Sequence, residues 1–167
     1  MKQKFNPNSD RAIAGKKFQE SVLKELQKWF PDAEDFREKE RQFGIDTGSP
    51  YTESELSILE KTFGDITFTA NGQRYYVECC FAMGDKYTNM CELKREGFVG
   101  FNKWYCWGKR INPKEIAFIP SRTWFSYLSK VDLHNKNGWR YRRMEIRKIG
   151  KNIRAAKTSY ESFFKAL

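Results

Sequence analysis

The feature that most constrains this chain is a pair of strand-like runs separated by Asn-Gly. Residues 65–69 and 73–81 are rich in β-branched and aromatic side chains, and Ala70-Asn71-Gly72 joins them. Asn-Gly between two such runs is the strongest short-range signal of a β-hairpin, because both residues accept the positive φ that its tight turn needs. The sequence therefore predicts a β-hairpin over about 65–81.

Helical and extended patterns surround this hairpin. Apolar residues three or four apart predict an amphipathic helix over 11–30, with Asp10 as its cap and Pro31 at its end. The aromatic residues between Phe98 and Trp107 are expected in the core, and His134 in a loop. The other expected elements are helices over 52–63, 88–102 and 121–131 and strands over 35–43 and 115–120.

Length and composition favour one α/β domain. The chain has 167 residues, of which 40% are hydrophobic and 16% aromatic, enough to bury a core. No internal repeat or long linker divides it, so a single domain over 1–167 is expected. No apolar run approaches the length of a membrane span and the N-terminus has no apolar signal core, so a cytoplasmic protein without a membrane partner is expected.

The charge of the chain favours a polyanionic partner. Thirty-one Lys and Arg against 21 Asp and Glu give a net charge of +10. Residues 136–157 hold nine basic residues and one acid, and interleaved apolar residues predict that this segment folds against the body as a fixed basic patch. The residues expected to contact nucleic-acid phosphates are Arg140, Arg142, Arg143, Arg147, Lys148 and Lys151.

The predicted hairpin can bring two acids together. Asp65 begins its first strand and Glu78 lies near the end of its second, and in an antiparallel pair these two ends are neighbours. A buried Glu78 would be costly without a cation or hydrogen-bond partners, although strand alternation equally allows it on a water-facing edge. Converging carboxylates are what magnesium-assisted phosphodiester hydrolysis needs.

These motifs resemble those of the PD-(D/E)xK nuclease superfamily, which includes restriction endonucleases and Holliday-junction resolvases. The resemblance spans roughly residues 11–131. It depends on a first helix containing Gly15-Lys16-Lys17-Phe18-Gln19-Glu20, then Gly64-Asp65-Ile66, Tyr76-Val77-Glu78-Cys79-Cys80 and a strand over 116–119. The resemblance implies a restriction endonuclease-like three-layer α/β fold, with a central mixed sheet that contains the hairpin and is flanked by helices.

The resemblance also implies a site. Asp65 and Glu78 would hold Mg²⁺, for which Mn²⁺ can substitute, and Glu20, or Gln19 in its place, would join them from the first helix. The family's lysine, two residues after the Glu, is Cys80 in this chain. A lysine from a later position, Lys86 or Lys94, would then stabilise charge on the phosphate.

The leading hypothesis for function is a metal-dependent DNA endonuclease, acting on branched or structured DNA, and resolvase-like enzymes suggest a homodimer. One alternative is a catalytically inactive nuclease fold that binds DNA, because Cys80 cannot supply a permanent positive charge. Another is an RNA-binding protein, since charge and aromatic content do not distinguish the two nucleic acids.

Overall fold

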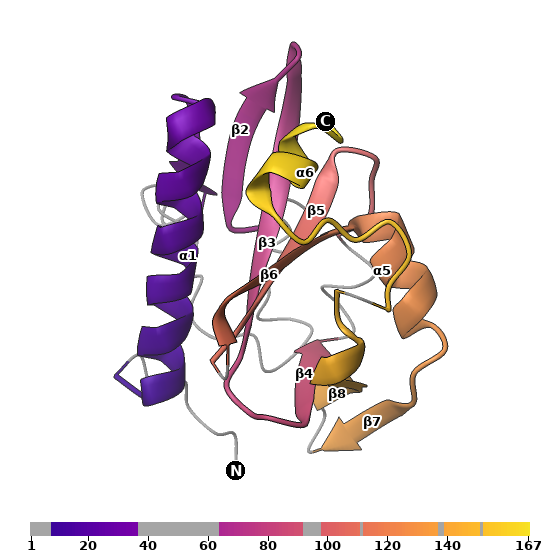
Figure 1. Ribbon diagram of the computed structural model, residues 1–167. Helices are drawn as coiled ribbons and strands as arrows, with labels where there is room; N and C mark the ends of the chain where they lie inside the picture. The colour runs from indigo at the N-terminus through magenta and orange to yellow at the C-terminus, as the bar shows by residue number, and fades with distance from the viewer. Residues whose placement is uncertain (1–7, 37–63, 92–97, 111, 137–138, 151) are drawn as a thin grey trace.

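A mixed five-stranded sheet forms the centre of the molecule (Figure 1). The computed structural model describes residues 8–36, 64–91, 98–110, 112–136, 139–150 and 152–167. The central sheet has the order β1-β2-β3-β5-β6, in which β3 and β5 are parallel and the other neighbours antiparallel. A second, antiparallel sheet has the order β4-β8-β7. The elements are α1 (Asp10–Trp29), β1 (Glu34–Asp35), β2 (Ile66–Ala70), β3 (Gln73–Ala82), β4 (Tyr87–Cys91), β5 (Lys103–Lys109), β6 (Asn112–Pro120), α5 (Ser121–Leu128), β7 (Leu133–Lys136), β8 (Trp139–Glu145), η2 (Ile146–Lys148) and α6 (Tyr160–Phe164).

The predicted hairpin is confirmed as β2 and β3. Its register runs from Ala70 opposite Gln73 to Ile66 opposite Val77. The turn residues Asn71 and Gly72 have φ angles of 50° and 73°. Two consecutive positive φ angles give a turn whose twist matches that of the strands, so the local sequence alone specifies this pairing.

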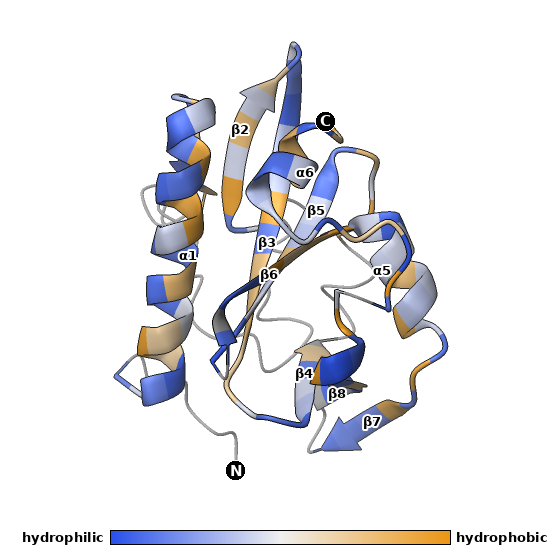
Figure 2. Cartoon of the chain, viewed as in Figure 1, coloured by the Kyte–Doolittle hydropathy of each residue, from blue (hydrophilic) through white to orange (hydrophobic). Residues whose placement is uncertain are grey.

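The predicted first helix is also confirmed, but its cap is Ser9 and not Asp10. The Ser9 hydroxyl accepts a hydrogen bond of 3.2 Å from the Ala12 N–H, while Asp10 lies in the first turn. The Ser9 hydroxyl, one residue before Asp10, satisfies one of the free N–H groups at the start of the helix. The Asp10 carboxylate then interacts favourably with the positive end of the helix dipole. Val22 and Leu26 are fully buried toward the sheet, and Figure 2 shows the apolar side of α1 facing β3.

Alternation along β3 separates the core into two clusters. Tyr75, Val77 and Cys79 belong to the first cluster, and Tyr76 and Cys80 to the second. We call the corresponding sides of the central sheet the first face and the second face. Because successive residues of a strand point to opposite sides, each cluster occupies one face.

Helices cover both faces, which confirms the predicted three-layer α/β architecture. On the first face α1 packs together with Phe163 of α6. On the second face the buried Trp124 and Leu128 of α5 pack beside Met90 of β4 and Met144 of β8. The three-stranded sheet therefore belongs to the layer over the second face.

The strand predicted over 115–120 and the helix predicted over 121–131 are confirmed as β6 and α5. The basic C-terminal segment is folded against the body, as predicted. Five of its described apolar residues are buried, namely Tyr141, Met144, Ile146, Ile149 and Ile153.

The helix predicted over 88–102 is wrong at both ends, and its middle, 92–97, lies outside the described residues. Tyr87–Cys91 is strand β4, which pairs with β8, and residues 98–102 form a bend and a turn before β5. The pairing partner lies more than fifty residues along the chain. A long-range partner of this kind is invisible to local periodicity, and it overrides local preference.

Strand β5 was missed because its aromatics were expected to pack a helix onto the sheet. Trp104, Tyr105 and Trp107 are in the core, as predicted, but they lie on a strand beside β3. Phe101, by contrast, is 65% exposed. β5 is buried on both faces, so its sequence is a continuous apolar run without alternation.

Two predicted elements fall wholly or partly on residues that the structure does not describe. The helix over 52–63 lies outside the described residues, and of the strand over 35–43 only its start coincides with β1. Within the described part of the chain, no helix is long and apolar enough to cross a membrane.

Candidate metal centre and nucleic-acid surface

The hairpin brings Asp65 and Glu78 together. The register of the hairpin ends where Ile66 is opposite Val77, so Asp65 and Glu78 are the next residues on the two strands. The Asp65 N–H donates a 2.9 Å hydrogen bond to the Val77 carbonyl, one residue out of that register, so the pairing is irregular at this point. We call Asp65 and Glu78 the acid pair.

Both acids are buried, each with 4% of its surface exposed. Glu78 lies between Tyr76 and Cys80, so alternation places it on the second face. β3 is an inner strand between β2 and β5, which excludes the alternative that Glu78 sits on a water-facing edge. Glu78 is thus on the second face of the sheet, and both members of the acid pair are shielded from bulk water.

Gly64 and Cys79 hold Asp65 in place. Gly64 has a φ of +69°, and a Cβ there would lie 3.0 Å from the Val77 carbonyl oxygen and 3.1 Å from the Phe98 ring. Only glycine allows this approach without strain. The Cys79 N–H then donates a 2.9 Å hydrogen bond to Asp65 Oδ2. The carboxylate therefore has a defined orientation before any ligand binds.

The electrostatics of the acid pair favour a cation. Burying one carboxylate is costly, and a second nearby carboxylate adds like-charge repulsion. A divalent ion between Asp65 and Glu78 would offset both terms. Among the described residues, no group of three or more His, Cys, Asp and Glu side chains gathers around a possible ion. Two carboxylates nevertheless fit Mg²⁺, which keeps several waters and is commonly bound by one or two carboxylates plus substrate phosphate.

The two cysteines that follow Glu78 have different surroundings. Cys79 points to the first face, where its side-chain hydrogen bond with Cys106, its burial and the nearby acid pair raise the pKa of its thiol well above the usual range. It therefore stays a protonated structural thiol. Cys80, at the position of the motif's lysine, is half-buried on the second face, the same side as Glu78.

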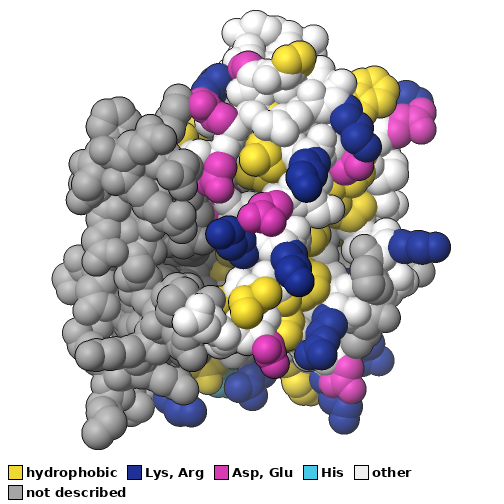
Figure 3. All heavy atoms as spheres, turned by 90° about the vertical axis from the view of Figure 1, so that its left-hand side faces the viewer, with side chains coloured by type: hydrophobic (Ala, Val, Ile, Leu, Met, Phe, Trp, Pro, Cys, Tyr) yellow, Lys and Arg dark blue, Asp and Glu magenta, His cyan; other side chains and the backbone are white. Residues whose placement is uncertain are grey.

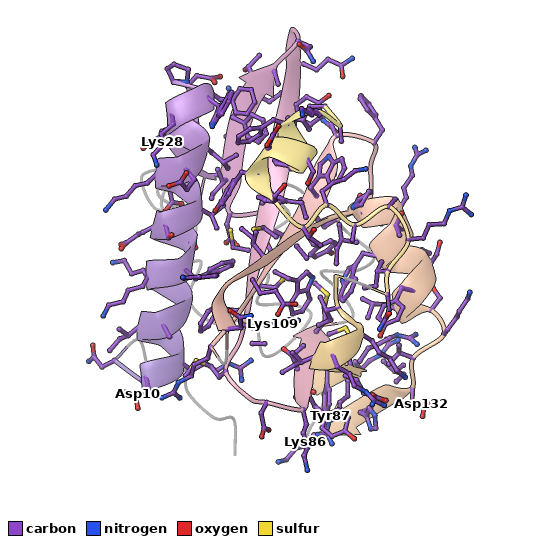
Figure 4. All side chains as sticks on the ribbon, in the orientation of Figure 1. Asp10, Lys28, Lys86, Tyr87, Lys109 and Asp132 are labelled. Carbon is purple, nitrogen blue, oxygen red and sulfur yellow. The ribbon has the colours of Figure 1, made fainter. Side chains whose placement is uncertain are left out.

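Of the other predicted catalytic residues, Glu20 does not gather with the acid pair in the described part of the chain. Glu20 is exposed on α1, and α1 covers the first face rather than the second. Gln19 is half-buried on the same helix. Lys86 is exposed beside Tyr87 at the lower end of the molecule, where β4 begins (Figure 4), and Lys94 lies outside the described residues.

Lys103 is a basic residue on the second face of the sheet that sequence reasoning missed. Lys103 of β5 is opposite Tyr76 of β3, and Tyr105 is opposite Glu78. Lys103 and Glu78 therefore point to the same face, in neighbouring rows of side chains on that face. Its Nζ lies 5.8 Å from the centre of the Phe98 ring, the ring that Gly64 approaches. Burial lowers the pKa of the Lys103 amine. A lysine at the start of an apolar run was the available signal, but that run was not predicted as a strand.

The predicted phosphate-binding residues differ in exposure and contacts. Arg147 and Lys148 are exposed and both pair with Glu145, at 2.7 Å and 3.1 Å. Arg142 is half-buried and donates to the Val131 carbonyl. Arg140 and Arg143 are exposed on β8, and Lys151 lies outside the described residues.

Basic charge is not gathered over α1. Figure 3 shows Lys and Arg mixed with Asp and Glu on the face that includes the outer side of this helix. Pairs such as Lys28 with Glu25, at 2.6 Å, contribute to the mixture. Mixed signs are typical of a solvated helix surface, so the arginines of β8 are better candidates for a polyanion.

Comparison with known proteins gives likeness in structure but not in sequence. No protein-family model and no curated protein sequence matches this chain. Among solved structures, it is similar to Hjc, a Holliday junction resolvase from Archaeoglobus fulgidus, with 14% sequence identity and a TM-score of 0.42 over 89% of this chain and 93% of that chain. A likeness this weak assigns no role to Asp65 or Glu78, so any role has to be argued from the geometry of this chain.

Proposed function

We propose that this protein hydrolyses phosphodiester bonds of DNA with a divalent metal ion held by Asp65 and Glu78. The observation that carries the proposal is the acid pair itself, two carboxylates that are each 4% exposed and lie where the paired part of the hairpin ends. Burying two carboxylates lowers the stability of the fold, and buried acids of this kind are often found where a protein binds a metal ion or carries out chemistry. Mg²⁺ or Mn²⁺ would polarise the phosphate and lower the pKa of a bound water.

The protein's own groups would orient the reaction. Asp65, fixed by the Cys79 N–H, would present one oxygen in a constant direction, and Glu78 would present another from the next strand. The burial of both residues keeps bulk water from competing for these oxygens.

A lysine would stabilise the charge that develops on the phosphate. Of the three candidates, Lys103 has the best support, because it lies one row from Glu78 on the same face. Lys86 and Lys94 are the candidates that follow from the sequence. Exposed arginines of β8 would hold DNA phosphates away from the reacting atoms. Cutting both strands of a branched DNA would call for two copies of the chain.

One observation favours the second candidate function, a DNA-binding module without catalysis. Cys80 is half-buried on the same face as Glu78, at the motif position where the resemblance calls for lysine. A thiol there cannot replace the charge of an ammonium group. In this case the acid pair would hold a metal ion that only bridges protein and phosphate.

Cleavage assays separate the two functions. The wild type and the variants Asp65→Asn and Glu78→Gln are incubated with plasmid and with branched DNA, in Mg²⁺, in Mn²⁺ and in chelator. The proposal expects metal-dependent cutting that falls about a thousandfold in each variant, while DNA affinity stays equal or rises because negative charge is removed. Glu161→Gln is the matched control, an exposed acid on α6 paired with Lys165. Binding without cutting in any metal would favour the binding module, and equal cutting by all variants would exclude the acid pair as the site.

A further inference from the structure

The three-stranded sheet has an inner and an outer side. Met90 of β4 and Met144 of β8 are buried in the second cluster, so they define the inner side. Alternation places Tyr87, Tyr141 and Arg143 on the opposite, outer side. None of these three residues belongs to either core cluster. The outer side therefore carries side chains that are not part of the two core clusters.

Aromatic and cationic groups form a continuous stack on this outer side. The Arg143 guanidinium carbon lies 6.0 Å from the Tyr87 ring centre and 5.9 Å from the Tyr141 ring centre. His134 of β7 stacks on Tyr141 at 5.4 Å and an interplanar angle of 18°. His134 was expected in a loop, and β7 places it here instead. We call Tyr87, Arg143, Tyr141 and His134 the outer platform.

The platform ends in an exposed ring. Tyr87 is 54% exposed, while Tyr141 beneath its neighbours is only 7% exposed. Arg143 is exposed and its Nε donates a 3.4 Å hydrogen bond to Asn89 Oδ1, which orients the guanidinium between the rings. The protein thus holds an exposed aromatic ring beside an exposed planar cation on the outer side of the three-stranded sheet.

We propose that the outer platform binds unpaired nucleotides of a DNA strand, with a base stacked on Tyr87 and the strand's phosphates near Arg143. Base–aromatic stacking combined with guanidinium groups is the usual way in which protein surfaces bind single strands. In a duplex the bases already stack on each other, so an exposed ring has nothing to contact. The net charge of +10 supplies the complementary field for a polyanion.

The platform follows the acid pair directly along the chain. β3 carries Glu78, ends at Ala82, and is followed by β4, which begins with Tyr87 (Figure 1). The choice of DNA as the partner rests on the proposed function, whereas stacking on the platform does not require catalysis.

Binding of a labelled oligothymidylate of about twelve nucleotides, within the site sizes typical of single-strand binders, tests the proposal. Fluorescence anisotropy is measured in chelator, so that cleavage plays no part. Tyr87→Ala should weaken binding about tenfold with an unchanged salt dependence, and Tyr87→Phe should bind like the wild type because it keeps the ring. Arg143→Ala should weaken binding and lower the salt slope by about 0.7.

Controls are available on the same chain. Phe101→Ala removes another exposed aromatic and Arg122→Ala another exposed arginine, and both should bind like the wild type. Oligouridylate of the same length should bind comparably, because stacking does not depend on the sugar, and duplex DNA should compete poorly. Wild-type affinity in Tyr87→Ala, or equal competition by duplex, would overturn the proposal. If Asp65→Asn binds the oligonucleotide and the wild type does not cut DNA, the proposed nuclease function is wrong and the proposal for the outer platform is retained.

Discussion

The acid pair and the outer platform are opposites in exposure, charge and origin. Asp65 and Glu78 are each 4% exposed and come from one hairpin, whereas Tyr87 is 54% exposed and meets Arg143 across β4 and β8. Buried like charges are tolerated only where backbone and ligand fix every oxygen, so the acid pair requires a rigid local frame. Exposed charges are screened by water and cost little, so a binding surface can be assembled from distant segments.

After the acid pair itself, the largest effect that separates the two regions is expected at Lys103. Lys103→Met should lower the cleavage rate about a hundredfold, since it removes a cation near the developing charge, while the outer platform keeps DNA affinity nearly unchanged. Lys130→Met, at an exposed lysine after α5, is the control. Single-turnover cleavage measures the difference. A loss of cleavage in Lys86→Met with none in Lys103→Met would support Lys86, the lysine predicted from the sequence, as the residue that stabilises charge on the phosphate.

The pH dependence of the same residue gives a second signature. Burial lowers the Lys103 pKa below its ordinary 10.5, so the charged amine is lost earlier as the pH rises. Between the lowered value and 10.5 the unfolded chain binds more protons, so the stability contributed by this group rises with pH while cleavage falls. Alkaline pH profiles of rate and of unfolding should therefore move in opposite directions, and parallel profiles would argue against Lys103.

The backbone around the acid pair is expected to be most sensitive to substitution at Gly64. Gly64→Ala should cost about 1–3 kcal/mol, because its positive φ and its contacts with Val77 and Phe98 both oppose a Cβ. Gly72→Ala is the matched control, with a φ of +73° but no heavy atom within 4 Å of the added carbon. It should cost about 1 kcal/mol for the backbone alone. Urea unfolding compares the two, and equal costs would show that the close approach is unimportant.

Metal binding should stabilise the acid pair and leave the platform unaffected. At an ion concentration about ten times Kd, Mg²⁺ should raise the free energy of unfolding by about 1.4 kcal/mol. Glu78→Gln should remove this increase and, in chelator, be more stable than the wild type, since the carboxylate repulsion is gone. Thermal unfolding with and without metal measures both. A full increase in Glu78→Gln would place the metal elsewhere, and Glu161→Gln should behave like the wild type.

The smallest effect is expected at the exposed cations near the platform. Arg147 has a side chain that is 80% exposed and pairs with Glu145 at 2.7 Å. Arg147→Ala should weaken duplex binding a few-fold and lower the salt slope by about 0.9, with unfolding changed by less than about 0.5 kcal/mol. Binding titrations at several salt concentrations measure the slope, and an unchanged slope would remove Arg147 from the phosphate contacts.

Much of the fold follows from local sequence. Asn71-Gly72 specifies the hairpin, the spacing of Val22 and Leu26 specifies α1, and Pro120 marks the end of β6. These signals act over a few residues, because turn φ angles and helix faces depend on near neighbours. The approach of Asp65 to Glu78 follows from the same hairpin, which is why the acids of the site could be named in advance.

Long-range pairing decided the rest. β4 was predicted as a helix because its partner β8 is far along the chain, and β5 was missed because burial on both faces removes its alternation. Lys103 became a candidate only once β5 placed it beside β3, and Tyr87 and Arg143 met only when β4 and β8 paired. The sequence by itself determined the hairpin and its two acids, through local backbone chemistry. The tertiary structure decided that these acids are buried and which cations lie near them, because strand pairing and burial depend on residues far apart in the chain.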